Sequence, residues 1–290
     1  MPLPRAVARL TARGPRVQRI EPALHRIPRM ATQIPSIPPA LADQLARARR
    51  VTVFTGAGVS AESGIATFRD PLTGLWARFD ARALATPEAF AAQPDLVWGW
   101  YEWRRAQVAR AEPNAAHRAI AALARRIPAL TLVTQNVDNL HERAGSDAVI
   151  HLHGSLHAPR CSACGHAARF APRAPDDGRD AAAEERAITP PACVECGAPI
   201  RPGVVWFGES LPADAWRAAQ QACGDCDLFF SIGTSALVYP AAELPLRAAR
   251  GGATVVQVNP APTPLDAHAD FNLRGAAADV MPRLLAAAGF

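Results

Sequence analysis

Short apolar runs, each ending in a turn or a polar loop, recur along the chain and predict the buried strands of a parallel sheet. They cover residues 51–55, 130–134, 228–232 and 254–258. Patterns typical of helices separate them, at residues 39–50, 88–111, 117–126, 213–223 and 240–250. Strands that alternate with helices indicate a doubly wound α/β fold, which binds its ligands at the carboxyl ends of the strands.

Two stretches interrupt this alternation. Residues 71–129 form a long, mostly helical excursion, and residues 158–203 hold two cysteine pairs around an acid-rich insert at 176–185. We expect both stretches to be insertions in a Rossmann-like domain, and to form together a smaller helical and zinc-ribbon domain. The whole folded domain would then span residues 39–290.

We expect the first 38 residues to form a disordered leader, because they are rich in arginine and proline and show no sustained apolar periodicity. The repeated prolines would break an amphipathic helix, which favours a bacterial extension over an organellar transit peptide. Met30 is an alternative start, since the first predicted helix follows it closely. The leader has no apolar signal-peptide core, so we expect a reducing cytoplasm, in which cysteines bind metal or stay free thiols.

Charge and hydropathy argue against two classes of function. The net charge of +5 comes from residues 1–50, which hold ten arginines and two acidic residues; residues 51–290 hold 21 arginines and 24 acidic residues. This slightly acidic part lacks a basic stretch with interleaved aromatic residues, so nucleic-acid binding is not expected. No apolar run approaches the ~18 to 20 residues of a membrane span.

Two C-x-x-C-G motifs predict a metal site. The first contains Cys161 and Cys164, and the second contains Cys193 and Cys196. At this spacing, two thiolates from one tight turn can reach a single tetrahedral Zn²⁺, and four thiolates close its coordination shell, so the predicted zinc is structural. A third pair, Cys223 and Cys226, lacks the following glycine and a partner pair. We expect it to pack in the core, with metal binding or redox chemistry as the alternative.

A glycine-rich turn follows the first predicted strand. It contains Gly56, Ala57, Gly58 and Ser60, and a helix is expected to begin there, so that backbone N–H groups and the helix N-terminus face a pyrophosphate. A Rossmann dehydrogenase would have a second strand that ends in a ribose-binding acid about 20 residues further on. Residues 67–71 predict a loop instead, so we expect a dinucleotide bound in a layout different from that of hydride-transfer enzymes.

Polar residues follow two further strands. Residues 134–138 come directly after one of them and should line a polar pocket. His151 and His153 share one face of another strand, because side chains alternate along a strand. His153 abuts Gly154 at the ligand-binding edge and is the candidate catalytic base, whereas His151 lies further inward and is interpreted as structural.

In sequence order, the motifs GAGVSAESGIATFRD, TQNVDNLH, HLHGS, the two cysteine pairs, VVWFGE, GTSALVYPA and VNP resemble those of the sirtuin family, over roughly residues 40–290. The resemblance implies a NAD-dependent protein lysine deacylase that consumes NAD, carries one structural Zn²⁺ and acts on acyl-lysine proteins. It also implies that the acyl oxygen attacks the ribose as nicotinamide leaves, which gives an imidate. His153 would then deprotonate a ribose hydroxyl that attacks the imidate carbon, and water would complete the release of free lysine and O-acyl-ADP-ribose.

The resemblance also assigns residues to the two substrates. Those implied to contact NAD are Gly56, Ala57, Gly58, Ser60, Phe68, Arg69, Trp76, Gln135, Asn136, Val137, Asp138, Gly233, Thr234, Ser235, Asn259, Pro260, Ala261 and Ala277. Those implied to bind the substrate peptide are Val205, Trp206, Phe207, Gly208 and Glu209. Phe68 would shield the reaction intermediate from water.

Tyr101 and Arg104 are similar to the Tyr-x-x-Arg signature of sirtuins that prefer succinyl- and malonyl-lysine. Positions i and i+3 share a helix face, so a phenol and a guanidinium can converge on one carboxylate, and the small Ala85 would widen the pocket. The alternative is a solvated Arg104 beside a Tyr101 that only packs. Three other functions remain open: a plain lysine deacetylase, a mono-ADP-ribosyltransferase on the same fold, and a non-enzymatic zinc-ribbon binding module.

Overall fold

The computed structural model describes residues 36–66, 80–169 and 187–290. The predictions for residues 1–35, for Phe68, Arg69 and Trp76, and for the acid-rich insert at 176–185 lie outside these ranges. Within them, no helix is both long and apolar enough to cross a membrane.

A parallel sheet forms the centre of the fold. In spatial order its strands are β3 (Ile150–His151), β2 (Ala129–Thr134), β1 (Arg50–Thr55), β6 (Leu228–Ile232), β7 (Thr254–Val258) and β8 (Phe271–Leu273). The predicted strands are confirmed as β1, β2, β6 and β7, and all neighbouring pairs are parallel. β1, β6 and β7 are buried almost throughout, as expected for strands covered on both faces.

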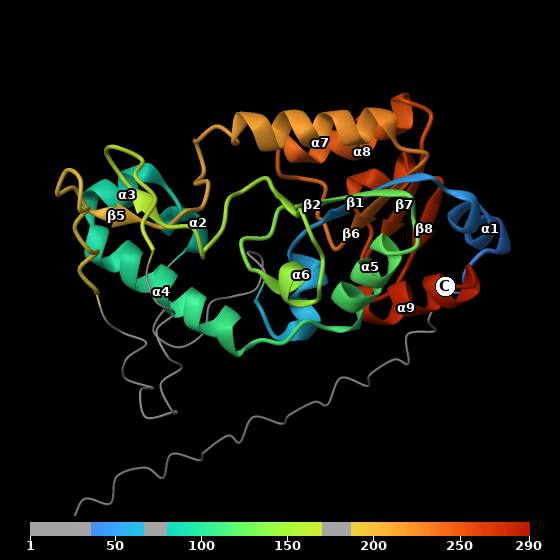
Figure 1. Cartoon of the computed structure of the whole chain (residues 1–290), viewed down its shortest axis with the longest axis horizontal. Helices are drawn as coiled ribbons and strands as arrows, with labels where there is room; N and C mark the ends of the chain where they lie inside the picture. Colours follow the sequence, from blue (N-terminus) through green and yellow to red (C-terminus); the bar gives the residue numbers. More distant parts are fainter. Residues whose placement is uncertain (1–35, 67–79, 170–186) are drawn as a thin grey trace, which may run out of the picture. The chain divides into compact units, whose positions relative to one another are not determined.

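Helices cover both faces of this sheet, with α7 and α8 on one side and α5 and α9 on the other (Figure 1). These elements are α5 (Ala115–Ala124), α7 (Ala213–Asp225), α8 (Leu244–Arg250) and α9 (Ala277–Ala287). Val53 and Phe230 point into the core under α5, α9 and α1 (Pro39–Arg47), whereas their neighbours Phe54 and Phe229 point into the core under α7 and α8. This alternation along each strand confirms the predicted doubly wound α/β fold.

The long predicted helix over residues 88–111 is divided in two. The structure has α3 (Pro87–Ala92) and α4 (Pro94–Arg110). Pro94 has no N–H to continue the helical hydrogen bonds of α3, and its ring disfavours a helical conformation at Gln93, which has φ −142° and ψ 67°. Other elements were not predicted from the sequence, among them the short helix α6 (Leu140–Arg143), the strand β8 and the helix α9.

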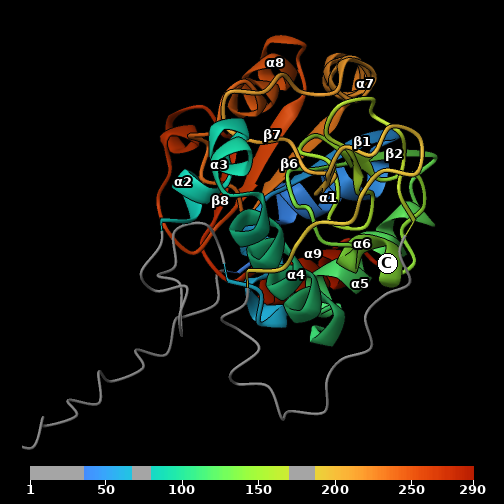
Figure 2. The same cartoon turned by 90° about the vertical axis from the view of Figure 1, so that its left-hand side faces the viewer.

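A second group of elements packs around aromatic side chains of α4. It contains α2 (Ala81–Leu84), α3, α4 and the antiparallel pair β4 (Arg160–Cys161) and β5 (Ile200–Arg201). Trp100 packs with Leu156 and Trp206, and Trp98 packs against Cys161 of the first cysteine motif. Figure 2 views α2, α3 and α4 in front of the sheet. The helical stretch and the cysteine-bearing stretch therefore contact each other through α4.

Candidate active site

A cavity of about 940 Å³ opens where β1, β2, β6 and β7 end. At this edge the connections from β1 and β6 part to opposite faces of the sheet, which is where doubly wound folds bind ligands. The predicted site residues that line the cavity are Gly56, Ala57, Gly58, Ser60, Tyr101, Arg104, Gln135, Asn136, Val137, Asp138, His153, Val205, Trp206, Phe207, Gly208, Glu209, Gly233, Thr234, Ser235, Asn259, Pro260 and Ala277. Ala261, which the sequence also assigns to NAD, is exposed and does not line it.

The glycine-rich turn after β1 does not open an α-helix, so the predicted helix N-terminus is wrong. Residues 57–59 and 61–63 form two three-residue 3-10 turns, and Gly64 ends them with a left-handed φ of 82°. Turns of this length align few peptide dipoles, so a helix dipole contributes little to phosphate binding here.

The same turn is hydrogen-bonded to the last residue of β6 and to the loop that follows it. The amide of Gly56 donates to the carbonyl of Ile232 (3.0 Å), and the amide of Gly58 donates to the carbonyl of Gly233 (2.9 Å). A Cβ atom on Gly58 would lie 2.7 Å from the Cα of Gly233, so only glycine fits this approach. The two loops thus form a continuous backbone surface against which a dinucleotide can lie closely.

A buried polar network lies beneath the cavity. The hydroxyl of Ser60 donates to Asp138 Oδ2 (3.0 Å) and accepts from Asn136 Nδ2 (3.0 Å). His117 Nε2 lies 3.4 Å from the same hydroxyl, and the amide of Asn114 donates to His117 Nδ1 (3.3 Å). The neutral ring therefore carries its hydrogen on Nε2. No local sequence pattern indicates His117, because its contact with Ser60 joins residues 57 positions apart.

A second buried histidine, His141, packs edge-on against His117, with 4.8 Å between the ring centroids. Its Nε2 lies 3.0 Å from the hydroxyl of Thr55. Burial lowers the pKa of His117 to about 4 and the pKa of His141 to about 3. Both rings are therefore neutral in the folded protein at pH values where the unfolded chain takes up protons.

We predict that acid destabilises the fold through these two histidines. Because both pKa values are lowered in the folded protein, protonation of these rings favours the unfolded chain. The stability that depends on neutral rings is fully present above the ordinary histidine pKa of about 6.5 and is lost as pH falls toward 4. At pH 5 each ring should cost about 2 kcal/mol of the free energy of unfolding, since one pKa unit corresponds to about 1.4 kcal/mol. Urea unfolding at pH 7.5 and pH 5 measures this loss. The variant His117→Gln should show about half of the histidine-linked loss, and an unchanged pH dependence in that variant would contradict the assignment.

His153 lies in a turn just beyond β3, and not on the strand as expected, because the pairing of β3 with β2 ends at His151. Its Nδ1 lies 3.1 Å from the carbonyl of Gln135, which can only accept, so Nδ1 carries the hydrogen and Nε2 of the neutral ring is a proton acceptor. Burial lowers the pKa of His153, against the opposing effect of the Gln135 carbonyl. The ring is thus neutral at pH 7, as a general base requires.

The backbone next to His153 is held by the segment that ends at Val205. The amide of Val205 donates to the carbonyl of His153 (2.8 Å). Gly154 has a left-handed φ of 72°, and a Cβ atom there would lie 2.2 Å from the carbonyl oxygen of Gly203. Glycine is therefore required at position 154, and the position of His153 is coupled to one wall of the cavity.

The predicted zinc ligands come together in the second group of elements. Their four Sγ atoms lie within 4.8 Å of one another. Between the two motifs, Cys161 Sγ is 3.4 Å from Cys196 Sγ, and Cys164 Sγ is 3.7 Å from Cys193 Sγ. Tetrahedral Zn–S bonds of ~2.3 Å would put the sulfurs about 3.8 Å apart, so the cluster fits one structural Zn²⁺. One cysteine of each motif is buried and the other is exposed.

Tyr101 and Arg104 lie one turn apart on α4 and line the cavity. The Tyr101 hydroxyl accepts a hydrogen bond from Trp206 Nε1 (3.0 Å), which orients it and leaves its own hydrogen to donate. The Arg104 guanidinium lies over the Trp100 ring, 5.1 Å from its centroid. Burial raises the pKa of Tyr101 to about 12 and lowers the pKa of Arg104. At neutral pH the cavity therefore contains a neutral phenol beside a cation.

Comparison with known proteins identifies the family. The sequence pattern of the Sir2 family matches residues 56–240. Over 240 residues, 83% of this chain and 92% of the relative, the chain is 67% identical to a protein of Methylococcus capsulatus named NAD-dependent protein deacylase. The chain belongs to the Sir2 family.

Two further Sir2 proteins support this assignment. A Pseudomonas aeruginosa protein named NAD-dependent protein deacylase 1 is 58% identical over 246 residues, which cover 85% of this chain and 97% of that protein. The crystal structure of a Sir2 homologue in complex with NAD superposes with a TM-score of 0.79 at 44% identity, and the match covers 88% of this chain and 94% of that one. The predicted sirtuin fold and family are confirmed.

Two segments of this Sir2 chain contribute exposed apolar side chains to the cavity lining. In the segment 205–209, the amide of Phe207 donates to the carbonyl of Ala85 (2.9 Å), and Glu209 pairs with Arg201 (2.5 Å). The other segment contains Leu237, Val238 and Tyr239, which are all exposed and which the sequence analysis did not assign to the site. With Phe207, they are four of the five exposed large hydrophobic side chains among the described residues. The cavity lining therefore includes exposed apolar side chains from both segments.

Cys223 and Cys226 are buried against α8 and the sheet. Burial raises the pKa of Cys223 to about 12 and raises the pKa of Cys226, so neither thiol ionises near neutral pH. Reactive and metal-binding cysteines are thiolates. The packing role expected for this pair fits the observed environment.

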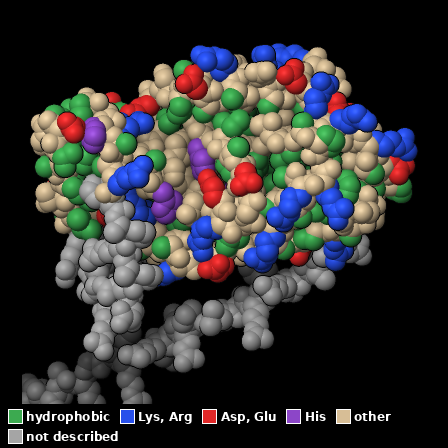
Figure 3. Space-filling view, in the orientation of Figure 1, with side chains coloured by type: hydrophobic (Ala, Val, Ile, Leu, Met, Phe, Trp, Pro, Cys, Tyr) green, Lys and Arg blue, Asp and Glu red, His purple; other side chains and the backbone are tan. Residues whose placement is uncertain are grey.

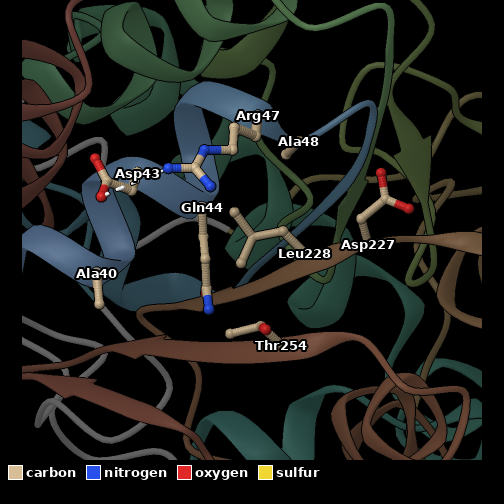
Figure 4. A pocket seen from close by; sticks show the side chains of 8 residues that line it. All are labelled: Ala40, Asp43, Gln44, Arg47, Ala48, Asp227, Leu228 and Thr254. Carbon is tan, nitrogen blue, oxygen red and sulfur yellow. Dashed lines mark ion pairs between the residues drawn. The ribbon is translucent and has the colours of Figure 1, made fainter.

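A second cavity of about 470 Å³ lies at the opposite edge of the sheet, beside the first residues of β6 and β7 (Figure 4). Its charged groups are already partnered. Asp43 pairs with Arg47 (3.8 Å), and Asp227 accepts from the amides of Arg49 (2.9 Å) and Arg50 (2.8 Å). We therefore assign no chemistry to this cavity.

Proposed function

We propose that this Sir2 protein removes acyl groups from protein lysines at the expense of NAD, with a preference for succinyl and malonyl groups, and releases nicotinamide and O-acyl-ADP-ribose. NAD-dependent deacylation is the activity for which relatives at 67% and 58% identity are named. NAD is the co-substrate, and the four cysteines hold a structural zinc. Since zinc ligation needs reduced thiolates, we place the protein in a bacterial cytoplasm.

The proposed chemistry depends on the neutral ring of His153. When NAD is bound, it supplies the ribose and the nicotinamide leaving group. The hydrogen bond from His153 Nδ1 to Gln135 fixes the tautomer, so that Nε2 can accept the proton of a ribose hydroxyl. Asn136 and Asp138, held by Ser60, form the polar wall beside it. Phe207 and Leu237 to Tyr239 provide apolar contacts for the peptide that carries the acyl-lysine.

The observation that carries the acyl preference is the pairing of Tyr101 and Arg104 inside the same cavity as His153. An acetyl group offers a methyl group at its end, whereas succinyl and malonyl groups offer a carboxylate. A guanidinium gives a carboxylate charge-assisted, bidentate hydrogen bonds, which are roughly twice as strong as neutral ones. The small, buried Ala85 lines the cavity as well and leaves room for the longer acyl group.

The variant Arg104→Met is expected to lower the kcat/KM of desuccinylation by roughly 30- to 1,000-fold, corresponding to a loss of ~2 to 4 kcal/mol when a bound carboxylate loses its counter-charge. Deacetylation should stay constant or rise, because an acetyl group makes no ionic contact. Tyr101→Phe removes one neutral hydrogen bond of ~1 kcal/mol and should cost less. Mass spectrometry of succinyl, malonyl and acetyl peptides incubated with NAD measures these rates.

Arg110→Met is the matched control, because Arg110 ends the same helix but does not line the cavity. If Arg104→Met lowers deacetylation as much as desuccinylation, Arg104 has a structural role. A wild-type protein without preference for succinyl over acetyl peptides is a plain deacetylase. Transfer of label from NAD to protein, without free O-acyl-ADP-ribose, would indicate a mono-ADP-ribosyltransferase.

A further inference from the structure

Both ring nitrogens of His151 face acceptors. Nδ1 lies 3.1 Å from the carbonyl oxygen of Asn136, and Nε2 lies 2.6 Å from Glu142 Oε1 on α6. A carbonyl and a carboxylate can only accept, so two hydrogen bonds require a hydrogen on each nitrogen. His151 is therefore an imidazolium in an ion pair with Glu142, unlike the neutral His153 two residues later.

The surroundings of His151 favour this charge. Its side chain is 17% exposed and that of Glu142 is 41% exposed, so solvent screens the pair only in part. Burial alone would lower the pKa of His151, but the hydrogen bond and charge of Glu142, the Asn136 carbonyl and the charge of Asp138 together raise it. His141 and His157 also face this group of charges. Figure 3 shows histidine and acidic side chains side by side near the middle of this face.

The two histidines hold neighbouring peptide groups of one loop. His151 donates to the carbonyl of Asn136, and His153 donates to the carbonyl of Gln135. The side chains of Gln135 to Asp138 line the cavity, and Asn136 also bonds to Ser60. A shift of the Asn136 carbonyl would therefore move the acceptor that fixes the tautomer of His153.

We propose that the His151–Glu142 ion pair is a positioning device for the general base, which holds the loop at residues 135–138 so that His153 keeps Nε2 aimed into the cavity. This inference rests on the proposed role of His153. His151 does not line the cavity, and it acts through the backbone of Asn136. A neutral His151 has one hydrogen for two acceptors, and the charged Glu142 is the stronger acceptor and keeps it. A lone pair on Nδ1 then faces the Asn136 carbonyl, and the contact that holds the loop is lost.

The device has a consequence for the pH dependence of activity. The rate should rise with pH as His153 becomes neutral, at a pH below the ordinary histidine pKa because the pKa of His153 is lowered. It should fall again at a higher pH, as His151 loses its proton, because the pKa of His151 is raised. The ion pair thus gives the pH profile of activity a falling part on its alkaline side, which we call the alkaline limb.

Glu142→Gln tests the proposal, because it removes the negative charge and keeps a hydrogen-bond acceptor. The midpoint of the alkaline limb of kcat/KM should move to lower pH by about one unit, so that activity falls roughly 5-fold at the wild-type midpoint and much less at pH values well below both midpoints. Glu142→Asp keeps the charge and should restore most of the wild-type limb. Glu112→Gln is the matched control, since Glu112 pairs with Arg143 nearby (3.0 Å) outside the cavity.

An alkaline limb that does not move in Glu142→Gln, or that moves equally in Glu112→Gln, overturns the proposal. A loss of activity that is equal at all pH values means a structural role only, and overturns it too. If Glu142→Gln does not fold, NMR titration of the His151 ring in the wild-type protein decides: its midpoint must lie above pH 6.5 and coincide with the alkaline limb. The variant His153→Ala separates failure of this proposal from failure of the proposed function. If that variant keeps its activity, His153 is not the base, but the ionisation of His151 can still be measured.

Discussion

His153→Ala should reduce NAD-dependent deacylation by about 10²- to 10⁴-fold, the range expected when a positioned general base is lost. The alanine variant has no group to accept the ribose hydroxyl proton at the place that Nε2 occupies beside the Gln135 loop. Zinc content and NAD affinity should stay close to wild type, because the zinc site and the glycine loops do not depend on this ring. Single-turnover formation of O-acyl-ADP-ribose, with NAD binding measured by calorimetry, separates the two effects.

His268→Ala is the control for this prediction. His268 is an exposed histidine that does not line the cavity. Its replacement should leave turnover near wild type. If His153→Ala keeps more than about a tenth of the wild-type rate, the base lies elsewhere, and the buried His117 beside Ser60 becomes the next residue to test.

Loss of zinc is expected to unfold the cysteine-bearing module and, with it, the wall of the cavity. Structural Zn²⁺ contributes an apparent ~10 to 16 kcal/mol at pH 7, which is as large as the entire stability of an ordinary domain at ~5 to 15 kcal/mol. The module packs on Trp98 of α4, the helix that carries Tyr101 and Arg104. Cys161→Ser should therefore give aggregated or unfolded protein, and a strong chelator should lower the Tm of the wild type.

Cys223→Ser provides the comparison for the zinc prediction. Because Cys223 packs away from the four-cysteine cluster, this variant should be soluble and active, and metal analysis should find one zinc per chain. Two zinc ions per wild-type chain would contradict the packing role of Cys223 and Cys226. A soluble, active and zinc-free Cys161→Ser protein would show that the metal is dispensable for folding.

Local sequence patterns are sufficient for four central strands of the sheet and for the zinc ligands. The four predicted strands need only a short apolar run and a turn, and the cysteine ligands lie three residues apart within each motif. In the helix α9, buried residues such as Val280 and Leu284 recur at the spacing of one helix face. We did not predict it, because Pro282 and the surrounding alanines obscure this apolar pattern.

The interior of the cavity depends on contacts that no local pattern contains. The hydrogen bond from Trp206 to Tyr101 joins residues 105 positions apart, and the approach of Gly58 to Gly233 joins two different loops. The same reason explains the error at residues 57–63. The amides of Gly56 and Gly58 donate to the end of β6 and to the loop after it, and 3-10 turns replace the expected helix. Sequence motifs thus identify which residues gather at the site, whereas long-range packing determines their orientation.

The four-cysteine cluster has an inner and an outer side. Cys161 and Cys193 are buried, whereas Cys164 and Cys196 are exposed. Peroxides in solution therefore meet one sulfur of each motif first, and oxidation of either would remove a ligand while the two inner sulfurs remain protected. Oxidative inactivation of the protein should consequently begin with zinc release and not with damage at His153, and a zinc-sensitive dye would detect it before the fold is lost.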